Sequence, residues 1–208
     1  MKFIDLTHSF SRKMPVFPGD AYPEWRQAAT IEKNGYNVVQ LRTGMHVGTH
    51  MDAPNHMVEG GRMLSDFPPE HLIGPACVVN AFEKSRVTLN ELDQTALNRA
   101  AIVLVYTGWD RYFGQEIYYR DYPELDLEFA SALVEAGIKI VGLDFPSPDR
   151  EPYAVHKKLL GNEVLIVENL TGLEALLPYP DIEVMALPAR YEADGAPVRV
   201  VASVGNGR

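Results

Sequence analysis

Cysteine is almost absent from this sequence: Cys77 is the only one among 208 residues. A single cysteine cannot form a disulfide within the chain, so a disulfide-stapled fold is excluded and a reducing compartment is expected. The chain also lacks the ~18 to 20 uninterrupted apolar residues of a membrane span, and no signal-peptide stretch follows Met1. The simplest expectation is a cytoplasmic protein.

Positive charge is scarce relative to negative charge. The sequence has 19 Lys and Arg against 28 Asp and Glu, a formal net charge of −9. Such a chain repels phosphate backbones and anionic lipid headgroups, so neither nucleic acid nor a membrane surface is expected as a partner. A glycine-rich phosphate loop, a GxSxG nucleophile turn and an HExxH zinc motif are all missing, which argues against organic cofactors, serine hydrolases and zincins.

Nearly half of the residues, 46%, are hydrophobic, and no repeat or linker is visible, so one domain over residues 1–208 is expected. Short apolar runs rich in β-branched residues predict buried strands. They cover residues 38–43, 76–82, 101–109, 138–145 and 164–170. Helical patterns between these runs favour an α/β fold.

Two segments carry the helical patterns. Residues 126–137 place Phe129, Leu133 and Ala136 on one face before Gly137, and residues 89–100 form a shorter candidate that begins at Asn90. Near the C-terminus, the dipeptide Asp194-Gly195 predicts the turn of a hairpin.

The most polar short stretch reads HVGTHMDAPNH, residues 46–56, and holds three of the six histidines. Its glycine and proline disfavour a helix. In an extended chain alternate side chains share a face, and that face would carry His46, His50, Asp52 and His56. Gly48 permits a kink that brings two imidazoles toward one ion. We interpret the stretch as a metal site; the alternative is scattered polar residues on a half-exposed strand.

This stretch resembles the cyclase-like metal-dependent hydrolases, which include bacterial kynurenine formamidases and isatin hydrolases. Their pattern is HxGxHxDxPxH, and every fixed position is matched. The stretches FIDLTHSF, PVFPGD, VGLDFPSPD, HKKLLGNEVLIVENL and LPARYEADGAPVRVVA also look like family counterparts. The resemblance implies an α/β fold of the swivelling β/β/α type with a mixed central sheet, assembled at least as a homodimer.

The resemblance also implies residue roles around two divalent ions, zinc or manganese. His46 and His50 would bind the first ion, His156 the second, and Asp52 would be shared between them. Glu168 would be a second bridging carboxylate. Phe17 stands where the family has a tryptophan and would pack on the substrate ring with a smaller face and no N–H donor.

The resulting hypothesis is hydrolysis of a small-molecule amide, an arylformamide such as N-formylkynurenine or a lactam, by metal-activated water. His56 would carry the proton to the leaving nitrogen; alternatively it is a further metal ligand. The competing functions are metal-assisted ring closure or dehydration, and metal binding without turnover.

Other polar residues are left open by the sequence. His8 either lines the pocket or only packs, and His71 has no assigned role. Asp144, Ser147 and Asp149 either orient the metal ligands or satisfy loop backbone. Cys77, in an apolar run without a neighbouring base, is expected to pack in the core rather than act as a nucleophile.

Overall fold

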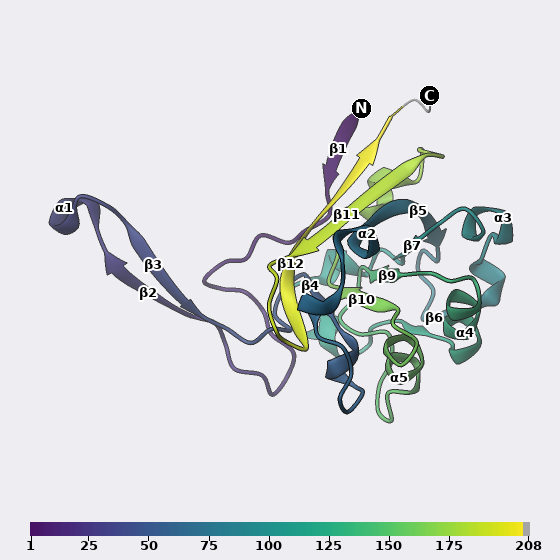
Figure 1. Ribbon diagram of the computed structural model, residues 1–208, viewed down its shortest axis with the longest axis horizontal. Coiled ribbons are helices and arrows are strands. Elements are labelled where there is room, and N and C mark those ends of the chain that lie inside the picture. The colour runs from purple at the N-terminus through teal and green to yellow at the C-terminus, as the bar shows by residue number, and fades with distance from the viewer. Residues whose placement is uncertain (206–208) are drawn as a thin grey trace.

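The centre of the protein is a closed β-barrel (Figure 1). The structure, a computed structural model, describes residues 1–205. The main sheet has eight strands in the order β1-β12-β11-β5-β7-β9-β10-β4, and β4 also pairs with β12, so every strand except β1 belongs to a ring. The ring strands are β4 (His50–Asp52), β5 (Ile73–Asn80), β7 (Ile102–Tyr106), β9 (Ile140–Leu143), β10 (Leu165–Glu168), β11 (Ile182–Pro188) and β12 (Gly195–Val204).

The barrel mixes parallel and antiparallel pairs. Strands β5, β7, β9 and β10 run parallel to one another, whereas β4, β11 and β12 join the ring antiparallel. The parallel strands β7, β9 and β10 are buried along their whole length, as expected where both faces of a sheet are covered. The expected α/β class with a mixed central sheet is confirmed, while the swivelling β/β/α arrangement stays a prediction.

Two apolar cores lie on the two faces of the ring. Alternate residues of β7 show the division: Ile102 and Leu104 belong to the core enclosed by the barrel, and Val103 and Val105 to the core under the helices. The second core receives the buried faces of α4 (Leu127–Glu135) and α5 (Ala154–Leu160). No helix within residues 1–205 has the length and apolar character needed to cross a membrane; the cytoplasmic location stays a prediction.

The remaining elements are short. They are strand β1 (Lys2–Asp5), the pair β6 (Arg86–Val87) and β8 (Glu124–Leu125), helices α2 (Pro69–Leu72) and α3 (Gln94–Leu97), and the 3-10 helices η1 (Pro54–His56), η2 (Leu64–Asp66), η3 (Leu89–Glu91), η4 (Trp109–Tyr112), η5 (Glu116–Tyr119) and η6 (Leu173–Leu176). Strand β1 extends the ring by pairing with β12, which places both ends of the described chain side by side (Figure 1).

A hairpin stands away from the barrel (Figure 1). We call it the arm: β2 (Glu24–Ala29), α1 (Ile31–Asn34) and β3 (Val38–Arg42). The sequence predicts a buried strand at residues 38–43, and this prediction is wrong about burial, since every residue of β3 is exposed. Among the described residues, strand β3 pairs only with β2, so within residues 1–205 no layer of the barrel covers either of its faces.

The predicted helix at residues 126–137 is confirmed as α4, with Gly137 in the left-handed conformation after its end. Its predicted face is only partly right, because Phe129 and Leu133 are buried and Ala136 is exposed. The predicted helix at residues 89–100 is instead two short elements, η3 and α3.

The break in that second helix has a local cause. The side chain of Asp93 accepts hydrogen bonds from the backbone N–H groups of Thr95 and Ala96, so a new helix begins there. Thr88, rather than Asn90, caps the preceding turn.

The C-terminal hairpin also differs from its prediction. Strands β11 and β12 pair antiparallel as expected, but their pairing starts at Pro188 and Val198. Asp194-Gly195 is therefore not the hairpin turn: Gly195 lies opposite Asp52 of β4, where the ring closes.

Candidate metal centre

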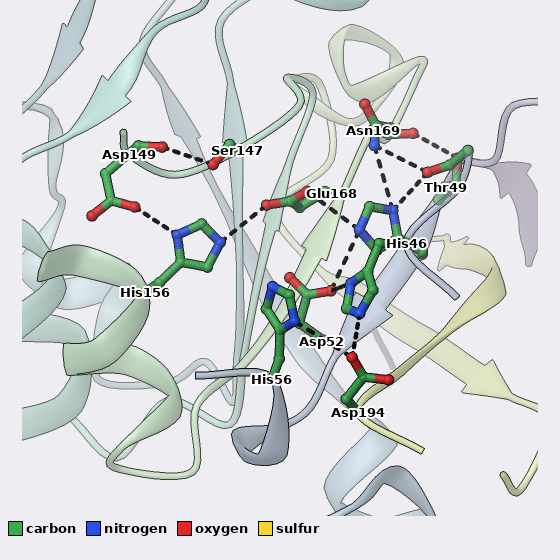
Figure 2. Close-up of polar contacts among 12 residues, drawn as sticks. His46, Thr49, Asp52, His56, Ser147, Asp149, His156, Glu168, Asn169 and Asp194 are labelled. Carbon is green, nitrogen blue, oxygen red and sulfur yellow. Dashed lines mark hydrogen bonds and ion pairs between the residues drawn. The ribbon is translucent and has the colours of Figure 1, made fainter. Parts of the chain in front are cut away.

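The stretch HVGTHMDAPNH changes direction at Gly48 and again at Pro54, and its polar side chains gather in one cluster (Figure 2). Gly48 has a φ of +70°, a conformation that favours glycine, and it separates His46 from strand β4. On β4, His50 and Asp52 share the outward face. Pro54 then begins η1, which returns His56 over His46 with 4.1 Å between the ring centroids. The predicted kink at Gly48 is confirmed.

Strand pairing brings Glu168 to this face from the other end of the chain. Glu168 of β10 lies directly opposite His50 in the β4–β10 register. Nε2 of His50 is 3.3 Å from Oε2 of Glu168 and 3.4 Å from Oδ1 of Asp52. The same Asp52 oxygen lies 2.7 Å from Nδ1 of His46, so one carboxylate contacts two imidazoles.

His156 completes the cluster from helix α5. Its Nε2 lies 3.4 Å from Oε1 of Glu168 (Figure 2). Because Oε2 of Glu168 contacts His50, Glu168 stands between the two imidazoles. The residue before α5, Tyr153, has a φ of +60° and places its ring edge-on to His156 at 5.8 Å. All five residues predicted as metal ligands therefore lie in one cluster, although the division of these ligands between two ions stays a prediction.

Hydrogen bonds orient two of the imidazoles. Nδ1–H of His50 donates to the backbone oxygen of Gly48 at 2.8 Å, and Nδ1–H of His156 donates to Asp149 at 2.6 Å. In each ring this bond holds the Nδ1 proton, so Nε2, which faces the carboxylates, is the atom that would give up its proton to bind a metal ion. Asp149 itself is fixed by the N–H of Val155 at 2.6 Å.

The electrostatics of the cluster call for a cation. Asp52 and Glu168 are only 1% and 6% exposed, and no Lys or Arg pairs with either of them within residues 1–205. Burial lowers the pKa of His156, but Asp149 and Glu168 outweigh it and raise the pKa to about 10. Burial also lowers the pKa of His46, but the carboxylates of Asp52 and Asp194 outweigh it and raise this pKa to about 9.

The residues fit divalent metal ions. Donor atoms of His50, Asp52 and Glu168 lie within 4.8 Å of one another, as do those of His46, Asp52 and His56. Mixed imidazole nitrogen and carboxylate oxygen suits zinc or manganese. With neutral imidazoles the two buried carboxylates would remain uncompensated, and divalent cations would supply the missing charge.

Asp194 is a further member of the cluster, and the sequence did not predict it. Its Oδ2 lies 2.9 Å from Nε2 of His46 and 3.6 Å from Nδ1 of His56. A Cβ on the adjacent Gly195 would meet His46 at 2.6 Å, so the ring occupies space that only glycine leaves free. No local signal identifies Asp194, because the β4–β12 pairing that places it joins residues far apart in the chain.

A cavity of about 340 Å³ opens onto the cluster. Phe17 lines it, and its ring packs edge-on against Tyr119 at 5.7 Å, while its contact with a substrate ring stays a prediction. Tyr153 forms a further part of the wall. Such walls, beside a few convergent polar groups, are typical of pockets for small aromatic ligands.

Two of the residues that the sequence left open lie near the cluster. Asp149 orients His156, and the hydroxyl of Ser147 donates to the backbone oxygen of Asp149 at 2.8 Å. Asp144 instead accepts hydrogen bonds from Thr107 and Gly108, away from the ligands.

The other three lie outside the cavity. His8 stacks on Phe113 at 3.7 Å, and His71 packs against Phe67 at 4.8 Å. Cys77 lies on β5 and packs against the core under the helices, where burial raises its pKa to about 11, so its thiol is protonated at neutral pH.

Comparison with known proteins agrees with this geometry. The family described as "Putative cyclase" matches residues 4–150. Kynurenine formamidases from Geobacillus thermodenitrificans (strain NG80-2) and Bacillus cereus (strain ATCC 14579) are each 31% identical, over 95% and 96% of both chains respectively.

Solved structures share the fold. A structure described as "predicted metal-dependent hydrolase from Bacillus stearothermophilus" has a TM-score of 0.78 at 25% identity and covers 97% of each chain. Isatin hydrolase A from Labrenzia aggregata has a TM-score of 0.83 at 22% identity, with 98% of this chain and 93% of that one covered; at this identity the likeness shows the fold alone.

Proposed function

Because the chain belongs to the "Putative cyclase" family, whose relatives include kynurenine formamidases and a metal-dependent hydrolase, we propose that it hydrolyses a small aromatic amide with two divalent ions. The substrate class is an arylformamide such as N-formylkynurenine, or a lactam. The observation that carries the proposal is the continuous chain of contacts from His156 through Glu168 and His50 to Asp52, buried at the floor of an aromatic-walled cavity.

The ligands would divide between two ions. His46, His50 and Asp52 would hold one, and His156 and Glu168 the other, with both carboxylates shared. Zinc or manganese held there would supply activation of water and polarisation of an amide carbonyl at neutral pH.

His56 is the residue placed to move the proton. It lies over His46 but 3.6 Å from Asp194, outside the contacts that join His50, His156 and the carboxylates. Burial lowers the pKa of His56, so the ring is neutral at pH 7 and can accept a proton. It would take the proton from the attacking water and return it to the amide nitrogen, which leaves as an amine when the C–N bond breaks.

The remaining contacts orient substrate and ligands. Phe17 and Tyr119 form one wall against which an aromatic ring can pack edge-on or offset. Asp149 accepts the Nδ1–H of His156, and the Gly48 carbonyl accepts the Nδ1–H of His50. These two bonds fix the direction in which each Nε2 points before substrate arrives.

The test is a substrate panel. Protein stripped of metal and reloaded with zinc or manganese is given formanilide, N-formylkynurenine and isatin, with a chelator-treated control. Metal-dependent release of formate from the two formamides, or ring opening of isatin, is expected. A protein that binds metal yet hydrolyses none of the three would contradict the proposed activity.

We also propose that the chain self-associates through the arm, with a second copy as its partner. Ile31 and Tyr36 at its tip are 64% and 58% exposed, and Val39 and Leu41 of β3 are exposed as well. A two-stranded hairpin is marginally stable alone, and one apolar surface can cover its own copy in a two-fold contact.

Light scattering after gel filtration tests the arm. Leu41→Asp is expected to shift a dimer toward monomer, whereas the control Gln40→Glu adds charge to the same strand on its other face and should not. A wild-type monomer, or a dimer indifferent to Leu41→Asp, would contradict this proposal.

A further inference from the structure

The mouth of the cavity is built by a tight turn, Phe17 to Asp20. The N–H of Asp20 donates to the backbone oxygen of Phe17 at 3.0 Å, and Gly19 has a φ of +105°. Proline followed by glycine with positive φ is the pattern of a type II turn. The turn therefore brings the backbones of Phe17 and Asp20 together, and both residues line the cavity.

Apart from its histidines, the charged side chains that line this cavity are all acidic. Its carboxylates are Asp20, Asp52 and Glu168, and no Lys or Arg lines it. Bound cations would compensate the inner two, Asp52 and Glu168. Asp20 is different, because within residues 1–205 no side chain forms a hydrogen bond or ion pair with its carboxylate.

A neighbouring hollow continues the mouth outward. This second cavity, of about 430 Å³, shares Phe17, Asp20 and Tyr119 with the first. Its one basic residue, Arg120, is paired with Glu116 and so leaves the charge of Asp20 uncompensated. There is room here for a substituent on a ring that packs against the wall formed by Phe17 and Tyr119.

The aromatic groups beside Asp20 suit a cation. Burial first, then Tyr22 and Asp20, raise the pKa of the Tyr119 hydroxyl above its usual value, so this phenol stays neutral beside the carboxylate. Faces of Phe and Tyr rings attract ammonium groups through their quadrupole, while an unpaired carboxylate adds direct attraction.

We propose that Asp20 determines specificity: the pocket favours an aromatic amide whose ring carries a cationic nitrogen and disfavours one whose ring carries an anion. The proposal deepens the proposed hydrolase function and rests on it. Because Asp20 is exposed and screened by solvent, its effect on the preference is modest, about fivefold. The preference should shrink as salt is added.

Binding and kinetics test the proposal separately. The binding probes are three anilines, the amine products of the matching formanilides: 4-(aminomethyl)aniline, aniline and 4-aminobenzoate, which are cationic, neutral and anionic at pH 7. Their dissociation constants are measured by NMR titration with wild type, Asp20→Asn and a control, Glu135→Gln. The control removes one negative charge from the exposed end of α4, and Glu135 does not line the cavity.

The wild type and the control are expected to bind the cationic aniline most tightly and the anionic one most weakly. Asp20→Asn should lower the cation-to-neutral preference about fivefold. In Asp20→Asn the ratio of the KM for the neutral formanilide to the KM for the cationic formanilide should fall by the same factor, while kcat changes little. Each substrate is compared between the two enzymes, so differences in reactivity among the substrates cancel.

Two outcomes would overturn the assignment of Asp20. One is an unchanged cation-to-neutral preference in Asp20→Asn; the other is a wild type that binds the three anilines equally or not at all. Failure of the hydrolase proposal looks different, because it appears as absent turnover of every formanilide while the ranking of the aniline affinities persists.

Discussion

Replacing Asp149 with asparagine should weaken metal binding while the fold is kept. Asp149 is buried, and each of its two oxygens accepts one hydrogen bond at 2.6 Å, from Nδ1–H of His156 and from the N–H of Val155. An asparagine of the same shape offers one oxygen and one NH2 group, so it can accept only one of these two bonds.

Either orientation of the amide carries a cost. If its oxygen accepts from Val155, its NH2 faces Nδ1 of His156, and the imidazole proton must move to Nε2, the atom aimed at Glu168. If its oxygen faces His156, the NH2 opposes the N–H at the start of α5. Loss of such an outer partner lowers metal affinity by about 10- to 100-fold, which corresponds to about 1.4 to 2.7 kcal/mol.

Zinc affinity of the metal-stripped protein, measured by competition with a chromophoric chelator, checks this prediction. Asp181→Asn, a change of the same kind at an exposed site, serves as the control. Thermal unfolding of both metal-free variants shows whether the fold is kept. A zinc affinity of Asp149→Asn within about twofold of wild type would refute the reasoning about tautomers.

Three further changes have distinct expected results. His56→Ala should keep the metal content and reduce turnover by about 10²-fold or more; loss of an ion instead would make His56 a ligand. Gly195→Ala places a Cβ 2.6 Å from His46 and 3.0 Å from a backbone oxygen, so the free energy of unfolding, measured with urea, should fall by about 1 to 3 kcal/mol. Asp144→Asn can keep its amide oxygen toward the N–H groups of Thr107 and Gly108 and turn its NH2 toward the Thr107 hydroxyl, which can accept, so the free energy of unfolding at pH 4 should change by no more than about 1 kcal/mol. Burial raises the pKa of Asp144 from 3.8 to about 7 despite these hydrogen bonds. The folded protein therefore holds the extra proton between these values, and wild-type stability should fall as pH rises from about 4 to 7, a slope that urea titrations of Asp144→Asn should lack.

Local sequence predicts much of this fold because helices and buried strands carry their own patterns. The runs that form β7 and β9 are apolar along their length and β10 is apolar up to Glu168, which is how strands covered on both faces appear. Strand β3 is also rich in β-branched residues, but within residues 1–205 no layer of the barrel covers it. Whether a strand is covered depends on tertiary packing, which the local sequence does not show. Closure of the barrel likewise depends on pairing between β4 and β12, about 140 residues apart in the chain.

The residues of the candidate site also divide into those that a local sequence pattern identifies and those that it does not. His46, His50, Asp52 and His56 lie within eleven residues, so their alternation and a glycine kink can be read directly from the sequence. His156 and Glu168 required the family resemblance, because neither has a local pattern of its own. Asp194 looked like part of a turn and was missed, since only the strand register places it beside His46.

Hydrolysis by this protein should require two ions, both held in the one cluster. Zinc is added in steps to the metal-stripped protein, and bound zinc per chain and formanilide hydrolysis are measured on the same samples. We expect two ions per chain, with turnover rising as the second binds and vanishing with chelator. Saturation without turnover, or a protein that binds no zinc, would contradict the account.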